Sequence, residues 1–436
     1  MSRTRSAAVR RPIHWVIALV VPLAACSGAA VREMPVAWTE QSNVLNNVTS
    51  GSGYRVLHRF LAEADGSYPG TLIAYNGDLY GTTAGGGDVS GPCAPVGCGT
   101  VFRMSRTGEK IVLYRFRGGS DAASPYLFAN LAVMHGTFYG TSGGGGNAAC
   151  PGGCGTIYSL TPSGKENVLY RFPPIAGTAF SYNPWTGLAA LGDKLYGVTG
   201  SGGRDLFNYC SCGIVFSFDP RDGAFKVIHR FDGADGSYPQ GGPTASQGQL
   251  YGTTWNGGAC VPCGVIFALS PTGAERVLFR FGGLDGANPQ GTLLVHGLIY
   301  GTTELGGNYE GLCEYNGCGT VFRLGENGNE RVLHRFTGGQ DGGLPQAGLT
   351  SLNGALYGTT AGLGNLPCSA YICGTVFRIT TTGRETVLHR FLGGSDGFGP
   401  QTNLVVLDGK LYGTTQSGGG KRCGGAGCGT VYEIAP

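Results

Sequence analysis

The chain has 436 residues, of which 41% are hydrophobic and 13% are charged, which is enough for a large buried core. This composition excludes a disordered chain, and the 82 glycines lack the every-third-residue spacing of collagen. The formal net charge is +3 and no basic stripe runs through the sequence, which argues against a nucleic-acid partner. Glycine-rich turns between short apolar runs predict an all-β fold.

Residues 1–25 are typical of an export signal. Four arginines precede an apolar run from Trp15 to Ala25, which is too short to cross a hydrocarbon core of about 30 Å. The stretch LAAC, ending at Cys26, resembles the lipobox of bacterial lipoproteins, in which cleavage precedes a cysteine that then carries lipid. Because Ser27 is not an aspartate, the resemblance implies an outer membrane lipoprotein facing the periplasm or the cell surface. Ordinary signal cleavage nearby is the alternative.

The mature chain differs in charge from the whole sequence. Loss of residues 1–25 removes four of the 30 basic residues and none of the 27 acidic ones, leaving a net charge of about −1. Residues 26–53 are rich in Ser, Asn, Thr and Gly, and we expect a flexible tether behind the lipid-bearing Cys26. Residues 54–436 then form the folded domain. We expect a monomer that contacts the membrane only through its lipid.

Three motifs recur seven times along residues 54–436. They are LYGTT, CGTVFR and VLHRF, each with variants. The tyrosines of the first motif lie 49 to 59 residues apart, at Tyr80, Tyr139, Tyr196, Tyr251, Tyr300, Tyr357 and Tyr412. Each repeat divides into four short runs of β-branched and aromatic residues separated by turn signals. This pattern predicts a seven-bladed β-propeller with four antiparallel strands in each blade.

The ends of the repeat region suggest how the ring closes. The first motif, Val56 to Phe60, is a fourth strand without a blade before it. The last motif, CGTVYEIAP, is a third strand without a fourth strand after it. We therefore expect the N-terminal strand to complete the last blade, which removes the open edges of the sheet array.

These repeats resemble the GloVer-type tandem repeats of bacterial exported proteins. The resemblance rests on LYGTT with its glycine run, on CGTVFRL and on VLYRF, and it covers Val56 to Ile434. It implies a secreted or surface propeller. It implies no particular activity.

The 15 cysteines divide into Cys26 and seven close pairs. The pairs are Cys93/Cys98, Cys150/Cys154, Cys210/Cys212, Cys260/Cys263, Cys313/Cys318, Cys368/Cys373 and Cys423/Cys428. An even set in an exported chain predicts disulfides, each contributing about 2 kcal/mol in the chain-entropy model. The spacing within the pairs varies too much for a metal site. A redox pair at CVPC, which ends at Cys263, is the remaining alternative.

Other motifs have structural interpretations. The glycine runs lead into another strand rather than a helix, which disfavours a phosphate loop. The third position of VLHRF holds His, Tyr or Phe, so its histidines are interpreted as packing residues (His58, His229, His334 and His389). Six arginines precede an aspartate by five or six residues, and we expect each Arg–Asp pair to fasten the crossing between two blades. Calcium at these Asp-Gly loops is the alternative, but it needs more oxygens than one aspartate supplies.

Deviations from the repeat mark the candidate site. The residue after YGTT is usually small or polar, but the fourth and fifth repeats place Trp255 and Glu304 there. The crossing into the third repeat lacks its Asp-Gly and ends at Trp185, and the next loop adds three further residues, Arg204, Asp205 and Tyr209. Aromatic rings beside carboxylates suit sugars, which pair apolar faces with hydroxyls. Divergent loops that merely pack on their neighbours are the alternative.

The leading hypothesis is a non-catalytic binding module for carbohydrate or protein that uses the long-loop face, without cofactor or metal. One alternative is a hydrolase or lyase acting on polysaccharide or a small molecule, with Glu304 or Asp205 as acid or base. A hydrolase needs a second carboxylate at a defined distance, which the sequence does not reveal. An envelope-assembly scaffold is a third possibility. Clustering of Trp185, Trp255 and Glu304 would support the binding module.

Overall fold

The computed structural model describes residues 53–175, 182, 184–203, 212–258, 263–295, 297–325, 327–362 and 373–436. The predicted signal segment, Cys26 and residues 27–52 therefore lie outside the described part of the chain. Within that part, no helix has the length and apolar character needed to cross a bilayer.

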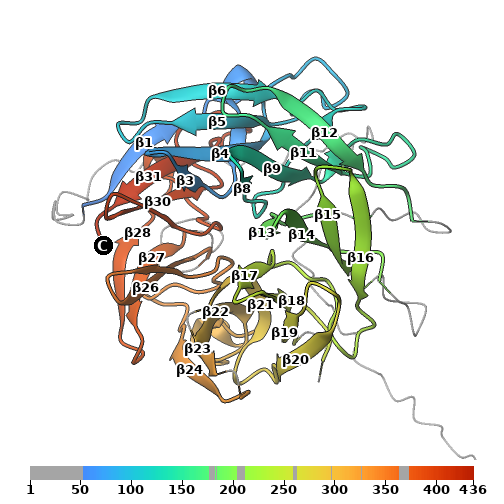
Figure 1. Cartoon of the computed structure of the whole chain (residues 1–436). Helices are drawn as coiled ribbons and strands as arrows, with labels where there is room; N and C mark the ends of the chain where they lie inside the picture. Colours follow the sequence, from blue (N-terminus) through green and yellow to red (C-terminus); the bar gives the residue numbers. More distant parts are fainter. Residues whose placement is uncertain are drawn as a thin grey trace, which may run out of the picture. The chain divides into compact units, whose positions relative to one another are not determined.

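Seven antiparallel sheets follow one another around a ring as blades, which confirms the predicted seven-bladed propeller (Figure 1). Blade 1 contains β3 (Ile73–Tyr75), β4 (Asp78–Gly85), β5 (Thr100–Met104) and β6 (Lys110–Arg115), and blade 2 contains β8 (Ala132–Met134), β9 (Thr137–Ser142), β11 (Thr156–Leu160) and β12 (Glu166–Arg171). Blade 3 contains β13 (Ala189–Leu191), β14 (Lys194–Thr199), β15 (Ile214–Asp219) and β16 (Ala224–Arg230), and blade 4 contains β17 (Thr244–Ser246), β18 (Gln249–Thr254), β19 (Val265–Leu269) and β20 (Glu275–Arg280). Blade 5 contains β21 (Ala287–Val295), β22 (Leu298–Leu305), β23 (Thr320–Gly325) and β24 (Glu330–Arg335), and blade 6 contains β25 (Thr350–Leu352), β26 (Ala355–Thr360), β27 (Thr375–Thr380) and β28 (Glu385–Arg390). Blade 7 contains β29 (Val405–Leu407), β30 (Lys410–Thr415), β31 (Thr430–Ile434) and β1 (Arg55–Arg59).

Short elements occupy the connections between these strands. The crossing from one blade to the next pairs with the loop between the second and third strands. Thus β2 (Ser67–Pro69) pairs with the end of β4, and β7 (Ala122–Ala123) pairs with β10 (Gly144–Gly145). This pairing confirms that both connections lie on one face of the ring. The short elements are β2 (Ser67–Pro69), β7 (Ala122–Ala123), β10 (Gly144–Gly145) and three 3₁₀ turns, η1 (Glu63–Asp65), η2 (Gly311–Cys313) and η3 (Gly394–Asp396).

The glycine of LYGTT has a packing reason. Gly81 pairs across β4 and β5 with Phe102, and a Cβ at Gly81 would lie 2.7 Å from Cζ of that ring. Gly252 has the same relation to Phe267, at 2.5 Å. The aromatic ring of the third strand therefore lies flat over the second strand, which only glycine permits.

The phenylalanine that ends VLHRF holds neighbouring blades together. Phe231 from blade 3 meets Phe267 of blade 4 edge to face, with ring centroids 5.2 Å apart. The same contact recurs seven times around the ring with centroids 5.1–5.7 Å apart, including Phe60 with Phe102 and Phe391 with Tyr432. Such pairs are worth about 0.5–1.5 kcal/mol each beyond the area they bury. One motif thus supplies seven equivalent interfaces.

The N-terminal strand closes the ring as predicted. Strand β1 pairs antiparallel with β31, with Arg55 opposite Glu433, and so becomes the fourth strand of blade 7. An ion pair of 3.1 Å joins the same two side chains. Closure leaves no blade with a missing outer strand.

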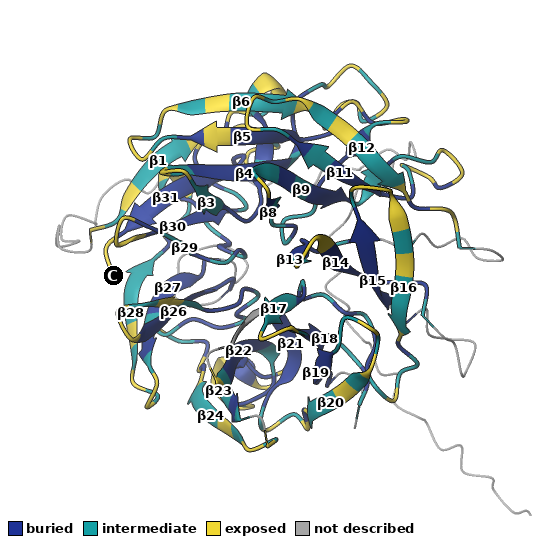
Figure 2. Ribbon diagram, in the orientation of Figure 1, coloured by how far each residue is buried: buried dark blue, intermediate teal, exposed yellow. Residues whose placement is uncertain are grey.

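Burial follows the position of each strand in its blade (Figure 2). The third strands β15 and β19 are buried along their whole length, whereas the outer strands β16 and β20 alternate between half-buried and exposed residues. The core therefore lies between the blades, and the outer strands face solvent with alternate side chains.

Disulfides fasten the loops between second and third strands. Four of the predicted bridges are present, Cys93–Cys98, Cys150–Cys154, Cys313–Cys318 and Cys423–Cys428, with Cα atoms 5.2–5.4 Å apart. Cys212, Cys263 and Cys373 are also disulfide-bonded. Their predicted partners, Cys210, Cys260 and Cys368, lie outside the described residues. A Cβ at Gly118 would lie 2.9 Å from the Cys98 sulfur, so the first bridge packs against the next crossing.

Candidate functional site

The crossings between blades bring seven equivalent residues to the centre of one face. Each crossing carries a buried proline that packs on the glycine of the preceding CGT motif; a Cβ at Gly264 would lie 2.6 Å from Cδ of Pro289. We call the residues that follow these prolines the hub ring: Gly70, Tyr126, Trp185, Gln240, Gln290, Gln346 and Gln401. Gln240 and Gln290 line a small pocket together with residues from other blades. These two members of the hub ring therefore lie near the propeller axis.

A second set of positions lies beside the hub ring. These are the residues after YGTT, which we call the loop-start positions: Ala84, Gly143, Gly200, Trp255, Glu304, Ala361 and Gln416. In blades 2 and 3 the hub-ring position holds a large aromatic side chain, and the loop-start position holds a glycine. A Cβ at Gly143 would overlap the Tyr126 ring, and one at Gly200 would touch the Trp185 indole at 3.7 Å. Blades 4 and 5 reverse the arrangement, with glutamines in the hub ring and Trp255 and Glu304 at the loop start.

Glu304 is the centre of the candidate site. Its Oε1 accepts a hydrogen bond of 2.7 Å from Gln346 Nε2. Its Oε2 accepts hydrogen bonds from Gln290 Nε2 and, at 3.4 Å, from Trp255 Nε1. These donors come from three successive blades, and we call Trp255, Gln290, Glu304 and Gln346 the hub cluster.

Burial and hydrogen bonding act on Glu304 in opposite directions. Burial raises the pKa of the Glu304 carboxyl above its usual range, and the hydrogen bonds from Gln346, Trp255 and Gln290 oppose the rise. As whole residues, Glu304 and Trp255 each keep some exposed surface. The backbone of Trp255 is fixed by a bond of 2.9 Å from Asn288 Nδ2 to its carbonyl oxygen. The cluster is therefore held in place from several sides.

Trp185 forms a second aromatic group of the hub. Its ring lies 5.7 Å from the Tyr126 ring at an angle of 50°. Burial raises the pKa of the Tyr126 hydroxyl, and the adjacent Trp185 indole opposes that rise. The structure thus joins Trp255 to Glu304 and joins Trp185 to Tyr126, on neighbouring parts of the same ring. Arg204, Asp205 and Tyr209, which the sequence also suggested, lie outside the described residues.

A small pocket lies where residues from five blades meet. Those residues include Thr71, Phe128, Gln240, Gln290 and Asn403, and the pocket has about 10 Å³ of free space. That volume holds no more than a water molecule. A larger ligand would therefore lie over this pocket rather than inside it.

The expected Arg–Asp contacts do not form in the described residues. Arg390 Nε donates instead to the backbone oxygen of Gln340 in the preceding crossing, at 2.8 Å. Asp396 accepts a hydrogen bond from the backbone N–H of Leu392 and lies 3.2 Å from His389 Nε2. Adjacent side chains on a strand point in opposite directions, so histidine faces the aspartate and arginine faces the neighbouring blade. The crossings are fastened, but by different partners from those predicted.

The motif histidines have a polar role that the sequence did not reveal. His58, His229, His334 and His389 each lie 2.9–3.2 Å from the aspartate of the following crossing. Tyr114 replaces histidine in blade 1 and donates to Asp121 at 3.0 Å. A tyrosine hydroxyl and an imidazole can both donate to a carboxylate, which explains why both occur at this position.

The comparisons with known proteins agree with the fold. No curated protein sequence matches the chain significantly. Among solved structures, an oligogalacturonate lyase in complex with manganese is similar with a TM-score of 0.55 and 12% identity, over 90% of this chain and 95% of that one. An oligogalacturonate lyase from Vibrio parahaemolyticus has a TM-score of 0.53 and 10% identity, over 88% and 93%. Puromycin hydrolase has a TM-score of 0.52 and 12% identity, over 82% of this chain and 51% of its own.

At these identities the solved structures share only the propeller fold. The family assignment comes instead from the sequence of the repeats. The family model described as the Gloeobacter/Verrucomicrobia repeat matches residues 40–210 and 207–432, nearly the whole folded region. The chain therefore belongs to the Gloeobacter/Verrucomicrobia repeat family.

Proposed function

We propose that this protein is an exported binding protein that holds a neutral saccharide over the hub cluster. The observation that carries the proposal is the Glu304 carboxylate, held by side-chain N–H groups from three successive blades beside the partly exposed ring of Trp255. Preorganised polar groups next to an aromatic face lower the cost of ordering a ligand. The hub cluster has both properties.

The chemistry of the hub suits a sugar. A pyranose presents an apolar C–H face, which an indole can cover, and hydroxyls that both donate and accept hydrogen bonds. The Trp255 ring supplies the first surface, and the Gln290 and Gln346 amides with the Glu304 carboxylate supply the second. The hub-ring and loop-start positions contain one carboxylate and no cation, which favours a neutral sugar over an anionic one.

Two features weigh against the alternative that the hub is a catalytic centre. Enzyme pockets for small molecules typically enclose about 300–1,000 Å³. The small pocket that Gln290 of the hub cluster helps to line has only about 10 Å³ of free space. Glycoside hydrolases commonly use two carboxyl groups. Glu304 is the only carboxyl group among the described hub-ring and loop-start positions.

The site would operate outside the cytoplasm. The four disulfides and the repeat family indicate an exported protein, because disulfides persist in oxidising compartments. We further propose that lipid at Cys26 tethers the propeller to the outer membrane.

A glycan array tests this function directly. We expect the wild type to bind neutral glycans, and Trp255→Ala to lose about tenfold or more in affinity because the stacking face is removed. Tyr315→Ala is the matched control, since Tyr315 is 88% exposed and belongs to neither the hub-ring nor the loop-start positions. Equal binding by wild type and Trp255→Ala, or a loss in Tyr315→Ala alone, would refute the hub as the sugar site.

A further inference from the structure

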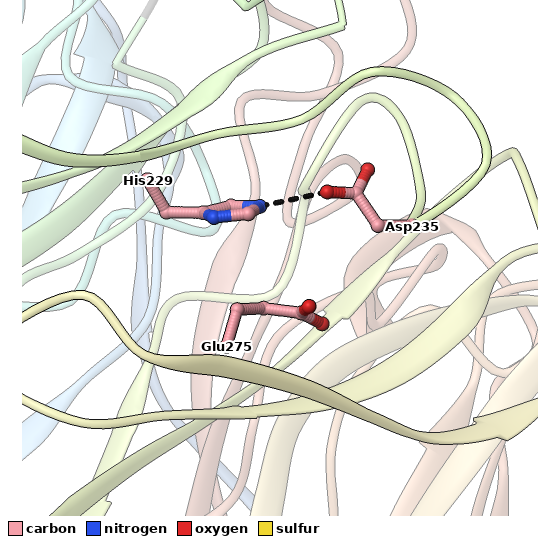
Figure 3. A group of neighbouring side chains, drawn as sticks. All are labelled: His229, Asp235 and Glu275. Carbon is pink, nitrogen blue, oxygen red and sulfur yellow. Dashed lines mark hydrogen bonds and ion pairs between the residues drawn. The ribbon is translucent and has the colours of Figure 1, made fainter.

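The rim of the propeller contains a second cluster, at the interface between blades 3 and 4. His229 extends from β16, Asp235 from the following crossing and Glu275 from β20, and their side chains converge (Figure 3). His229 Nε2 lies 2.9 Å from Asp235 Oδ2. One possible ligand atom from each of the three residues lies within 4.8 Å of the other two. The three groups could therefore share one small cation.

One oxygen in this cluster lacks a partner. Glu275 Oε1 is buried and accepts no hydrogen bond from any described residue. A buried carboxylate oxygen is costly unless a hydrogen bond or a positive charge compensates for its lost hydration. The cluster thus combines a possible imidazole ligand, two carboxylates and one uncompensated oxygen.

The equivalent interface between blades 7 and 1 shows what fills such a space. His58 and Asp65 there match His229 and Asp235, but Lys110 takes the position of Glu275. Lys110 Nζ donates to Asp65 Oδ1 at 2.8 Å and to the Asp65 backbone oxygen at 2.6 Å. Its side chain is only 4% exposed. In this interface the chain supplies its own cation.

We propose that His229, Asp235 and Glu275 bind one divalent transition-metal ion, such as Zn²⁺ or Mn²⁺, which takes the place of the Lys110 ammonium. Imidazole with carboxylates suits these ions, whereas Ca²⁺ is bound by oxygen ligands. Tetrahedral bonds of about 2.0–2.2 Å place the ligand atoms of one ion about 3.3–3.6 Å apart. The widest of the three separations would therefore have to shorten by up to about 1.5 Å when the ion binds.

Other interfaces limit the number of such sites. Between blades 4 and 5, Phe279 stands where the imidazole would be, so Asp285 and Glu330 have no nitrogen ligand beside them. Between blades 5 and 6 the histidine, aspartate and glutamate are all present, but the Thr337 hydroxyl already donates to Asp341. The proposal therefore applies first to the interface of blades 3 and 4.

The experiment is a calorimetric titration of ZnCl₂, and separately MnCl₂, into the tag-free protein after treatment with a chelator. We expect the wild type to bind at least one equivalent. Glu275→Lys, which copies the residue that the chain itself uses at Lys110, should bind one equivalent fewer. Glu330→Gln is the matched control and should bind as many as the wild type. Thermal unfolding of each variant shows that it is folded.

His229→Phe provides a second test if Glu275→Lys fails to fold, because Phe279 already occupies the equivalent position. It too should bind one equivalent fewer, or bind that equivalent at least about tenfold more weakly. Absence of binding by the wild type to both metals would overturn the proposal. So would unchanged stoichiometry and affinity in Glu275→Lys or in His229→Phe. That result would leave a shared proton as the partner of the buried oxygen.

Discussion

At the rim of the propeller, one aromatic contact recurs in every interface between blades, whereas at the hub the equivalent positions carry different side chains. The rim keeps an edge-to-face aromatic contact in all seven interfaces, from Phe60 with Phe102 to Phe391 with Tyr432. The hub ring changes from glycine to tyrosine, tryptophan and glutamine. A residue that packs against the same kind of neighbour in every blade tolerates little change. A residue at the hub has a different neighbour in each blade, so it can vary. The repeated rim contacts stabilise the fold, and the variation at the hub is what we expect if, as proposed, the hub recognises a ligand.

The largest effect is expected at the rim from Lys110→Met. This change leaves the partly buried Asp65 carboxylate without the buried Lys110 ammonium, which should cost about 3 kcal/mol of unfolding free energy. Lys410→Met is the matched control, because Lys410 is 51% exposed and its ion pair with Glu433 should contribute less than about 1 kcal/mol. Urea unfolding midpoints measure both. Similar small shifts in the two variants would break the distinction between the buried and exposed pairs.

Lowering the pH should remove the stabilisation that the Asp65–Lys110 ion pair gives to the wild type. Although burial opposes it, hydrogen bonds from His58 and Lys110 hold the pKa of Asp65 well below its usual range. A depressed carboxyl pKa stabilises the fold above the unfolded value of about 3.9, and this stabilisation is lost as the pH falls below it. Between pH 5 and pH 3, the stability of the wild type should therefore fall more steeply than that of Lys110→Met. Parallel pH profiles would contradict this assignment.

A smaller effect of opposite sign is expected from Glu330→Gln. Burial, together with the charge of Asp285, raises the pKa of Glu330 to about 7, while Arg335 opposes the rise. A raised carboxyl pKa supports the fold below the unfolded value of about 4.3, and that support is lost as the pH rises through 7. The variant should therefore exceed the wild type by about 1 kcal/mol at pH 8, allowing for solvent screening, and match it near pH 4. Unfolding at both pH values checks the prediction; an equal difference at both would contradict it.

The smallest effect on stability is expected at the hub. Trp255→Ala removes a partly exposed ring and one long hydrogen bond of 3.4 Å to Glu304, so unfolding free energy should fall by about 1 kcal/mol. The same change should abolish most saccharide binding. A large loss of stability without any change in binding would place Trp255 with the rim residues as a scaffold element.

The repeat made much of the fold predictable from the sequence. Seven copies of each motif specified the blades, and the unmatched strand at Val56 to Phe60 specified closure by β1. The disulfides followed from the close cysteine pairs, four of which the structure describes. Local spacing was sufficient for six blades, because each is built from strands of one repeat; blade 7 is the exception, since β1 pairs with β31 from the other end of the chain.

The candidate site was only partly predictable. Trp255 and Glu304 stood out because they broke a repeated position, and the structure joins them by a hydrogen bond. The hub ring was missed, although the recurring Pro-Gln pairs that contain Gln240, Gln290, Gln346 and Gln401 are a readable signal. Glu275 could not be placed beside His229 because it comes from the next blade, and its approach depends on how the two blades pack. The Arg–Asp expectation was wrong because spacing along a strand does not show which way a side chain points.

The central claim is that the hub cluster contacts a neutral saccharide. It is tested most directly by tryptophan emission during titration with neutral hexasaccharides, namely cellohexaose, xylohexaose and mannohexaose, in the wild type and in Trp255→Phe. The account predicts a saturable change of emission in the wild type with at least one of these sugars. It predicts loss of that change in Trp255→Phe, although Trp185 remains. An equal response in both proteins, or no response in the wild type, would contradict it.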